Sequence, residues 1–136
     1  MRVYLVRHAH SDPGDPDELR PLSSRGQGEA LALGHRLAGQ PMPPRLVVSS
    51  PLLRARETAE AIADATSAEL RVDERLAPGA TLELLQQVLD GAEAPIAIVG
   101  HQPDCSEIAI ALTGDDPGFA TGSFVAVDLG PDEGSG

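Results

Sequence analysis

The chain has 136 residues, a formal net charge of −11, and a composition that is 41% apolar but only 2% aromatic. This length predicts one domain with a core of aliphatic side chains, while the acidic balance argues against nucleic acid or an anionic membrane as a partner. No apolar run approaches the ~20 residues that span a bilayer, and Arg7 and His8 interrupt the first apolar stretch, so we expect a cytoplasmic protein without a signal peptide.

The chain alternates strand-like and helix-like segments. In chain order, the predicted elements are a strand at 3–6, a helix at 23–37, a strand at 46–49, a helix at 51–65, a strand at 69–72, a helix at 81–89, a strand at 96–99, a helix at 103–112 and a strand at 124–129. Except for 69–72, these strands are nearly continuous apolar runs, which predicts burial on both faces. The alternation predicts an α/β fold, a three-layer α/β/α sandwich around a mostly parallel sheet. We expect one domain over residues 1–129 and a flexible tail at 130–136.

Prolines stand near the start of two predicted helices. Pro51 and Pro103 are expected in the first helical turn, where the missing N–H of proline costs nothing. The free N–H groups of those turns would face the ends of the preceding strands, a setting that suits an anionic ligand.

Basic side chains follow three of the predicted strands. Arg7 and His8 directly follow the first strand. Arg54 comes soon after the second strand, and His101 follows the strand at 96–99. Because ligands of parallel α/β folds lie beyond the carboxyl ends of the strands, we expect these side chains at one edge of the sheet.

Two arginines and two histidines at one edge suit a phosphoryl group. Arginine presents a planar fork that matches phosphate oxygens. A neutral imidazole can attack phosphorus and hold the phosphoryl group covalently, and a second imidazole, if protonated, can donate to the equatorial oxygens. The pattern therefore indicates phosphoryl transfer.

Spaced motifs in a fixed order carry a resemblance to a known family: RHA at 7–9, PLSSRG at 21–26, SSPLLRARETA at 49–59 and VGHQP at 99–103. Over residues 2–129 the chain resembles the histidine phosphatase (phosphoglycerate mutase-like) superfamily. Its small size and its Arg20-Pro21-Leu22 element are most similar to the short SixA-like phosphohistidine phosphatase branch. Ala9 stands where the family signature has glycine, as is common in the short bacterial branch.

The resemblance implies roles for five side chains. His8 would be the nucleophile that becomes phosphohistidine. Arg7, Arg54 and His101 would bind the phosphoryl oxygens, and His101 would also stabilise the transition state. Arg20 would add a contact to the substrate. No metal ion and no other cofactor would be needed.

His10 leaves an alternative open. Strand alternation would put His8 and His10 on one side, and with His101 they would make a three-histidine metal site. The nearby arginines would repel a divalent cation, so we expect His10 to border the pocket and to touch substrate instead.

The substrate class depends on the leaving group. Larger relatives carry an acid after the third strand that protonates it, and here only Glu74 and Glu83 are candidates. A phosphohistidine leaves through an imidazole nitrogen and needs less help from an acid, which favours a phosphatase for phosphohistidine-bearing proteins. The alternatives are a phosphatase for small phosphorylated molecules and a phospho-binding module that does not hydrolyse.

Overall fold

The structure, a computed structural model, describes residues 1–130. Its elements are β1 (Arg2–Arg7), η1 (Asp17–Leu19), α1 (Ser24–Ala38), β2 (Leu46–Ser49), α2 (Leu53–Thr66), β3 (Glu69–Val72), η2 (Glu74–Leu76), α3 (Leu82–Leu89), β4 (Ile96–Gly100), α4 (Asp104–Thr113) and β5 (Ser123–Asp128), where η marks a 3₁₀ helix. Every predicted strand and helix is present. The tail predicted at 130–136 lies outside the described residues, apart from Gly130. Within residues 1–130, none of the helices has the length and apolar character that crossing a bilayer requires.

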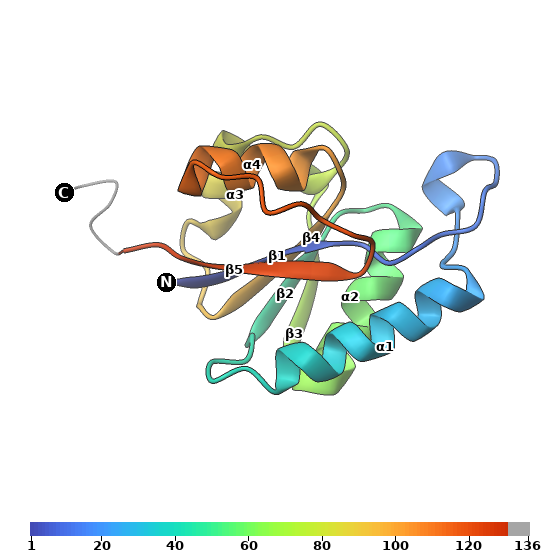
Figure 1. Ribbon diagram of the computed structural model, residues 1–136, viewed down its shortest axis with the longest axis horizontal. Helices are drawn as coiled ribbons and strands as arrows, with labels where there is room; N and C mark the ends of the chain where they lie inside the picture. Colours follow the sequence, from blue (N-terminus) through green and yellow to red (C-terminus); the bar gives the residue numbers. More distant parts are fainter. Residues whose placement is uncertain (131–136) are drawn as a thin grey trace.

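A five-stranded sheet forms the middle layer of the molecule (Figure 1). The strand order is β3-β2-β4-β1-β5, in which β5 runs antiparallel to β1 and all other neighbours are parallel. Side chains of β1 alternate between the two faces. Tyr4 and Val6 pack with α1 and α2, whereas Val3 and Leu5 pack with α3 and α4. This arrangement is the predicted α/β/α sandwich with a mostly parallel sheet.

The prediction that strand 124–129 is buried on both faces is wrong. β5 spans Ser123–Asp128, and only Val127 in it is buried. β5 stands at the end of the sheet and pairs with β1 alone, so its outer side faces solvent.

The starts of α2 and α4 also differ from the prediction. Pro51 precedes α2, because Leu52 takes the N-cap position with an extended backbone (φ −68°, ψ 140°) and the helix begins at Leu53. Pro103 is itself the N-cap residue of α4 and not part of its first turn. Each helix still begins within a few residues of its strand, and so stays at the carboxyl edge of the sheet.

α1 approaches the segment after β1 so closely that one helix position has no room for a side chain. A Cβ atom at Gly26 would lie 1.8 Å from the carbonyl oxygen of His10, whereas a Cβ atom at Gly28 would meet nothing within 4 Å. Ser23 joins the two segments. Its N–H donates to the His10 carbonyl at 3.0 Å, and its Oγ caps α1 by accepting from Gly26 N–H at 3.0 Å. Gly26 therefore sets how closely the first helix packs against the segment that follows His8.

Gly26→Ala is expected to lower the free energy of unfolding by about 1–3 kcal/mol, because the obstructing atom belongs to the backbone and two segments must separate. Gly28→Ala is the matched change in the same helix. It is expected to raise the free energy of unfolding by about 0.5–1 kcal/mol, since alanine is the better helix former. Chemical denaturation of both variants beside wild type measures the difference, and equal effects would contradict the close approach at Gly26.

Candidate active site

The carboxyl end of β1 brings two histidines side by side. Arg7 pairs with Gly100 of β4 in parallel register, and the backbone N–H of His8 donates to the Gly100 carbonyl at 3.1 Å. His8 and His101 therefore leave neighbouring strands together. Their ring centroids lie 5.1 Å apart with an interplanar angle of 58°. His101 is buried, with 4% of its surface exposed, and His8 is partly buried.

His8 is held in one tautomer. Its Nδ1 lies 2.7 Å from the carbonyl oxygen of Ala9. A carbonyl oxygen can only accept, so Nδ1 carries the ring proton and Nε2 keeps its lone pair. Ala9 is fixed in turn, because its N–H donates to Thr58 Oγ1 at 3.0 Å and Thr58 donates to the Arg54 carbonyl at 2.8 Å. His8 thus presents the unprotonated nitrogen that attack on phosphorus requires.

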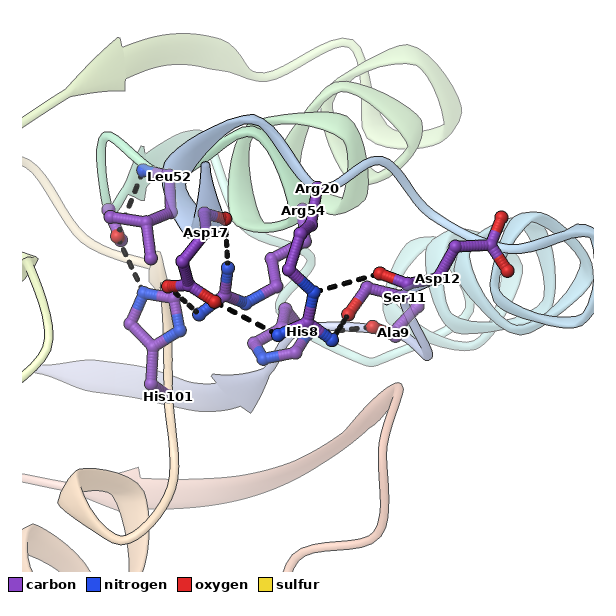
Figure 2. A network of polar contacts seen from close by, with 10 residues as sticks. His8, Ala9, Ser11, Asp12, Asp17, Arg20, Leu52, Arg54 and His101 are labelled. Atoms are coloured by element: carbon purple, nitrogen blue, oxygen red, sulfur yellow. Dashed lines mark hydrogen bonds and ion pairs between the residues drawn. The ribbon is translucent and has the colours of Figure 1, made fainter. Parts of the chain in front are cut away.

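Arg54 and Arg20 lie beside the His8 ring and share one carboxylate (Figure 2). Arg54 comes from the first turn of α2, and only 9% of its side chain is exposed. Its Nη1 donates to the Asp17 carbonyl at 3.0 Å and its Nη2 to the Asp17 carboxylate at 3.3 Å. Arg20 Nη1 donates to the same carboxylate at 3.0 Å. These bonds hold the segment after β1, at Asp17, against the start of α2.

Two buried nitrogens in this region have no hydrogen-bond partner among residues 1–130: Arg7 Nε and His101 Nδ1. One other nitrogen of each side chain is anchored. Arg7 Nη1 donates to the Phe119 carbonyl at 2.7 Å, and His101 Nε2 lies 2.7 Å from Ser50 Oγ. Buried polar atoms in folded proteins are nearly always paired. Arg7 Nε and His101 Nδ1 are therefore unsatisfied polar atoms close to the His8 ring in the part of the chain that the structure describes.

Burial and the neighbouring cations keep both histidines neutral. Burial lowers the pKa of His8 to about 4, and the charges of Arg54 and Arg7 act in the same direction. Burial lowers the pKa of His101 to about 3, with contributions from His8 and Arg54. Both rings are therefore neutral near pH 7. His101 is therefore not the protonated donor considered from the sequence.

In the folded protein the His8 ring is expected to titrate near pH 4, and in the urea-unfolded chain near pH 6.5. Between these values the unfolded chain binds more protons than the folded one. The free energy of unfolding is therefore expected to be highest above about pH 6.5 and to fall as the pH drops towards 4. NMR titration of the ring resonances, assigned with His8→Ala, measures the midpoint. A folded-state midpoint near 6.5 would contradict the buried, cation-flanked setting.

The structure gathers five of the six predicted site residues at one edge of the sheet: Arg7, His8, Arg20, Arg54 and His101. The ring of the sixth, His10, is held at the start of α1, where its Nδ1 lies 2.7 Å from Ser23 Oγ. Within residues 1–130, no three His, Cys, Asp or Glu side chains gather closely enough to hold a metal ion. The three histidines of the alternative therefore do not form such a group in the described part of the chain.

Neither acid candidate has a side-chain hydrogen bond or ion pair to these arginines or histidines among residues 1–130. Glu74 lies in η2 and Glu83 in α3, and both are exposed. The acid that contacts the site arginines is Asp17, which was not among the residues predicted from the sequence. Ser50 and Thr58 were also missed as site residues, although each had a usable signal. Ser50 directly follows β2, and Thr58 lies one helical turn after Arg54.

Known proteins resemble the chain in sequence and in fold. Residues 3–78, more than half of the chain, match the family described as the histidine phosphatase superfamily (branch 1). An uncharacterized protein of Picosynechococcus sp. is 35% identical over 127 residues, which cover 82% of this chain and 73% of the relative. The phosphohistidine phosphatase SixA of Escherichia coli is 28% identical over 140 residues, covering 95% of this chain and 86% of the relative. The solved structure of the protein histidine phosphatase SixA complexed with tungstate matches with a TM-score of 0.84 at 28% identity, over 95% of this chain and 88% of that one.

Proposed function

Because the chain belongs to the histidine phosphatase superfamily and is a SixA-like phosphatase, we propose that it removes the phosphoryl group from phosphohistidine-bearing proteins. The reaction needs no metal ion and passes through a phosphohistidine on His8. Arg7, Arg54 and His101 bind the phosphoryl oxygens. The SixA relative of Escherichia coli is named for this substrate class, which supports the proposal at 28% identity.

The observation that carries the proposal is the tautomer of His8. The hydrogen bond between Nδ1 and the Ala9 carbonyl leaves the lone pair on Nε2, and burial keeps the ring neutral by lowering its pKa to about 4. A neutral imidazole flanked by the guanidinium groups of Arg7 and Arg54 can attack a phosphoryl group whose charge those groups neutralise.

The reaction has two steps. In the first, Nε2 of His8 forms a bond to phosphorus while the bond from phosphorus to the substrate nitrogen breaks, and the leaving nitrogen keeps the electron pair. In the second, water attacks the phosphoryl group and the bond to Nε2 breaks. Both hydrogens of the water leave with the product as dihydrogen phosphate, and His8 returns to its neutral form.

Arg20 and His10 take different places in this proposal. For Arg20 the proposal keeps the contact to the substrate, and the ion pair to Asp17, which Arg20 shares with Arg54, supports a place at the edge of the site. For His10, the bond to Ser23 Oγ supports a structural role at the start of α1 rather than the substrate contact expected from the sequence.

The edge of the sheet supports a protein substrate. The connections after β2 and β4 are short, at residues 50–52 and 101–103. The longer connection after β1 is exposed over residues 12–19. A phosphorylated side chain on the surface of another protein can reach a site bordered in this way. The cytoplasmic location stays a prediction from the sequence.

Hydrolysis of a phosphohistidine peptide beside p-nitrophenyl phosphate, both with a chelator present, tests the proposal. We expect turnover that resists the chelator and a higher kcat/KM for the phosphohistidine peptide. The opposite preference would point to a phosphatase for small molecules. Binding without turnover would point to a phospho-binding module, and loss of activity with the chelator would overturn the metal-independent mechanism.

A further inference from the structure

Asp17 contacts the site arginines with both its backbone and its carboxylate. The ion pairs of Arg54 and Arg20 within residues 1–130 both go to this carboxylate, at 3.3 and 3.0 Å. The Asp17 carbonyl accepts a further hydrogen bond from Arg54 Nη1 at 3.0 Å. A phosphoryl group bound by Arg54 would therefore lie next to a carboxylate. Such a neighbour weakens binding of a dianion unless it serves the reaction in another way.

Asp17 lies on the solvent side of the site. Its side chain is 56% exposed, whereas that of Arg54 is 9% exposed. In-line transfer requires the leaving nitrogen to lie opposite His8 Nε2 across phosphorus. Since the leaving group of a protein substrate stays attached to that protein, it enters from solvent. Asp17, which lies beside Arg54 (Figure 2), is therefore on the side where the leaving group arrives.

The chemistry of a phosphohistidine leaving group favours an anionic neighbour. One ring nitrogen is bonded to phosphorus, and the other is free to carry a proton. When the free nitrogen is protonated, the P–N bond breaks with its electron pair going to the leaving nitrogen, and the ring departs as neutral imidazole. Without that proton it would depart as imidazolate, a far poorer leaving group. The reactive substrate is the cationic ring, and no proton has to be transferred when the P–N bond breaks.

We propose that Asp17 is a specificity-determining residue: its carboxylate accepts a hydrogen bond from the protonated ring of the phosphohistidine substrate and favours an imidazole leaving group over an anionic one. This inference rests on the proposed function, because it concerns the leaving group of that reaction. A carboxylate that accepts from an imidazole N–H stabilises the cationic ring. The same carboxylate repels the phenolate that forms when a phenyl ester is cleaved.

The ionisation state of Asp17 suits a hydrogen-bond acceptor for the protonated ring better than it suits a proton donor. The hydrogen bond from Arg20 lowers the pKa of the Asp17 carboxyl, and the charge of Arg54 acts in the same direction. The group is therefore an anion near pH 7 in the free enzyme. An anion suits a substrate that brings its own proton.

The test compares kcat/KM for a phosphohistidine peptide and for p-nitrophenyl phosphate in wild type, Asp17→Asn and Asp12→Asn. Asp12 lies in the same loop, and its carboxylate points away from the Asp17–Arg54 pair (Figure 2). We expect Asp17→Asn to lose about 10-fold or more on the phosphohistidine peptide. On the phenyl ester the loss should be smaller or reversed, so that the preference for the phosphohistidine peptide falls. Asp12→Asn, with the same change in charge, should match wild type on both substrates.

The outcomes separate the inference from the function on which it rests. If wild type hydrolyses the phosphohistidine peptide but Asp17→Asn changes both substrates equally, or neither, the role of Asp17 is wrong and the proposed function stands. If wild type does not hydrolyse the peptide, both the role of Asp17 and the proposed function are wrong. Asp17→Glu keeps the charge, so it should retain more of the phosphohistidine preference than Asp17→Asn. Thermal unfolding of each variant shows whether a loss of activity reflects a loss of fold.

Discussion

His8→Ala is expected to lower kcat/KM by roughly 10⁴-fold or more, on the phosphohistidine peptide and on p-nitrophenyl phosphate alike. The variant lacks Nε2, the atom that forms the bond to phosphorus. The proposed oxygen-binding groups, Arg54 and His101, remain, but they do not replace a nucleophile. Steady-state kinetics measures the loss. Mass spectrometry of wild-type enzyme quenched in base should detect a covalent phosphoryl group that His8→Ala does not carry.

His35→Ala is the matched control, because His35 is exposed on α1 and away from the site. It should keep wild-type activity. Free imidazole added to His8→Ala offers a second check, since it can enter the space left by the side chain and accept the phosphoryl group. Retention of a tenth or more of the wild-type kcat/KM by His8→Ala, without added imidazole, would rule out His8 as the nucleophile.

Arg54→Lys is expected to reduce kcat/KM by about 10²–10³-fold although it keeps the positive charge. The guanidinium of Arg54 already donates from both Nη atoms to Asp17, and its remaining N–H groups are available to phosphoryl oxygens. A lysine ammonium has three donors on a point charge, so it cannot hold Asp17 and two phosphoryl oxygens in one plane. Equilibrium binding of inorganic phosphate should weaken together with catalysis.

Arg56→Lys provides the control in the same helix. The Nε of Arg56 donates to the Pro51 carbonyl at 3.0 Å, so this guanidinium is occupied at the start of α2. Its replacement should leave kcat/KM near the wild-type value and should shift the thermal midpoint at most slightly. Equal losses in Arg54→Lys and Arg56→Lys would mean that the kinetic effect comes from α2 as a structural element and not from a contact to phosphate.

Local sequence signals were strong enough to predict most of the secondary structure. β2 covers Leu46–Ser49 as predicted, since a short apolar run with turn residues on both sides has few other interpretations. α1 begins directly after its capping serine, Ser23, and ends before Gly39. The exposure of β5 depends instead on which strand becomes its neighbour. That is a property of the whole sheet, and the apolar run at 124–129 does not contain it.

The candidate site, like the secondary structure, could be predicted from the sequence only in part. The candidate catalytic side chains could be placed together because the carboxyl ends of parallel strands share an edge. Asp17 could not be singled out, since it lies in a loop with several carboxylates: Asp12, Asp15, Asp17 and Glu18. The 3₁₀ turn of η1 and the buried guanidinium of Arg54 decide which of them faces the site. Neither feature has a local sequence pattern.

The unequal lengths of the connections at this edge bear on how such a protein can diversify. The connections at residues 50–52 and 101–103 are short. Ser50 and His101, which lie in them, are buried beside the proposed phosphoryl site. Residues 12–19 are exposed, and Asp17 among them contacts the site through its ion pair with Arg54. Exposed loops accept substitutions and insertions far more readily than buried ones. Under the proposed function, a descendant of this chain can therefore change its phosphorylated partner by altering one stretch of surface, while the proposed catalytic groups are inherited unchanged.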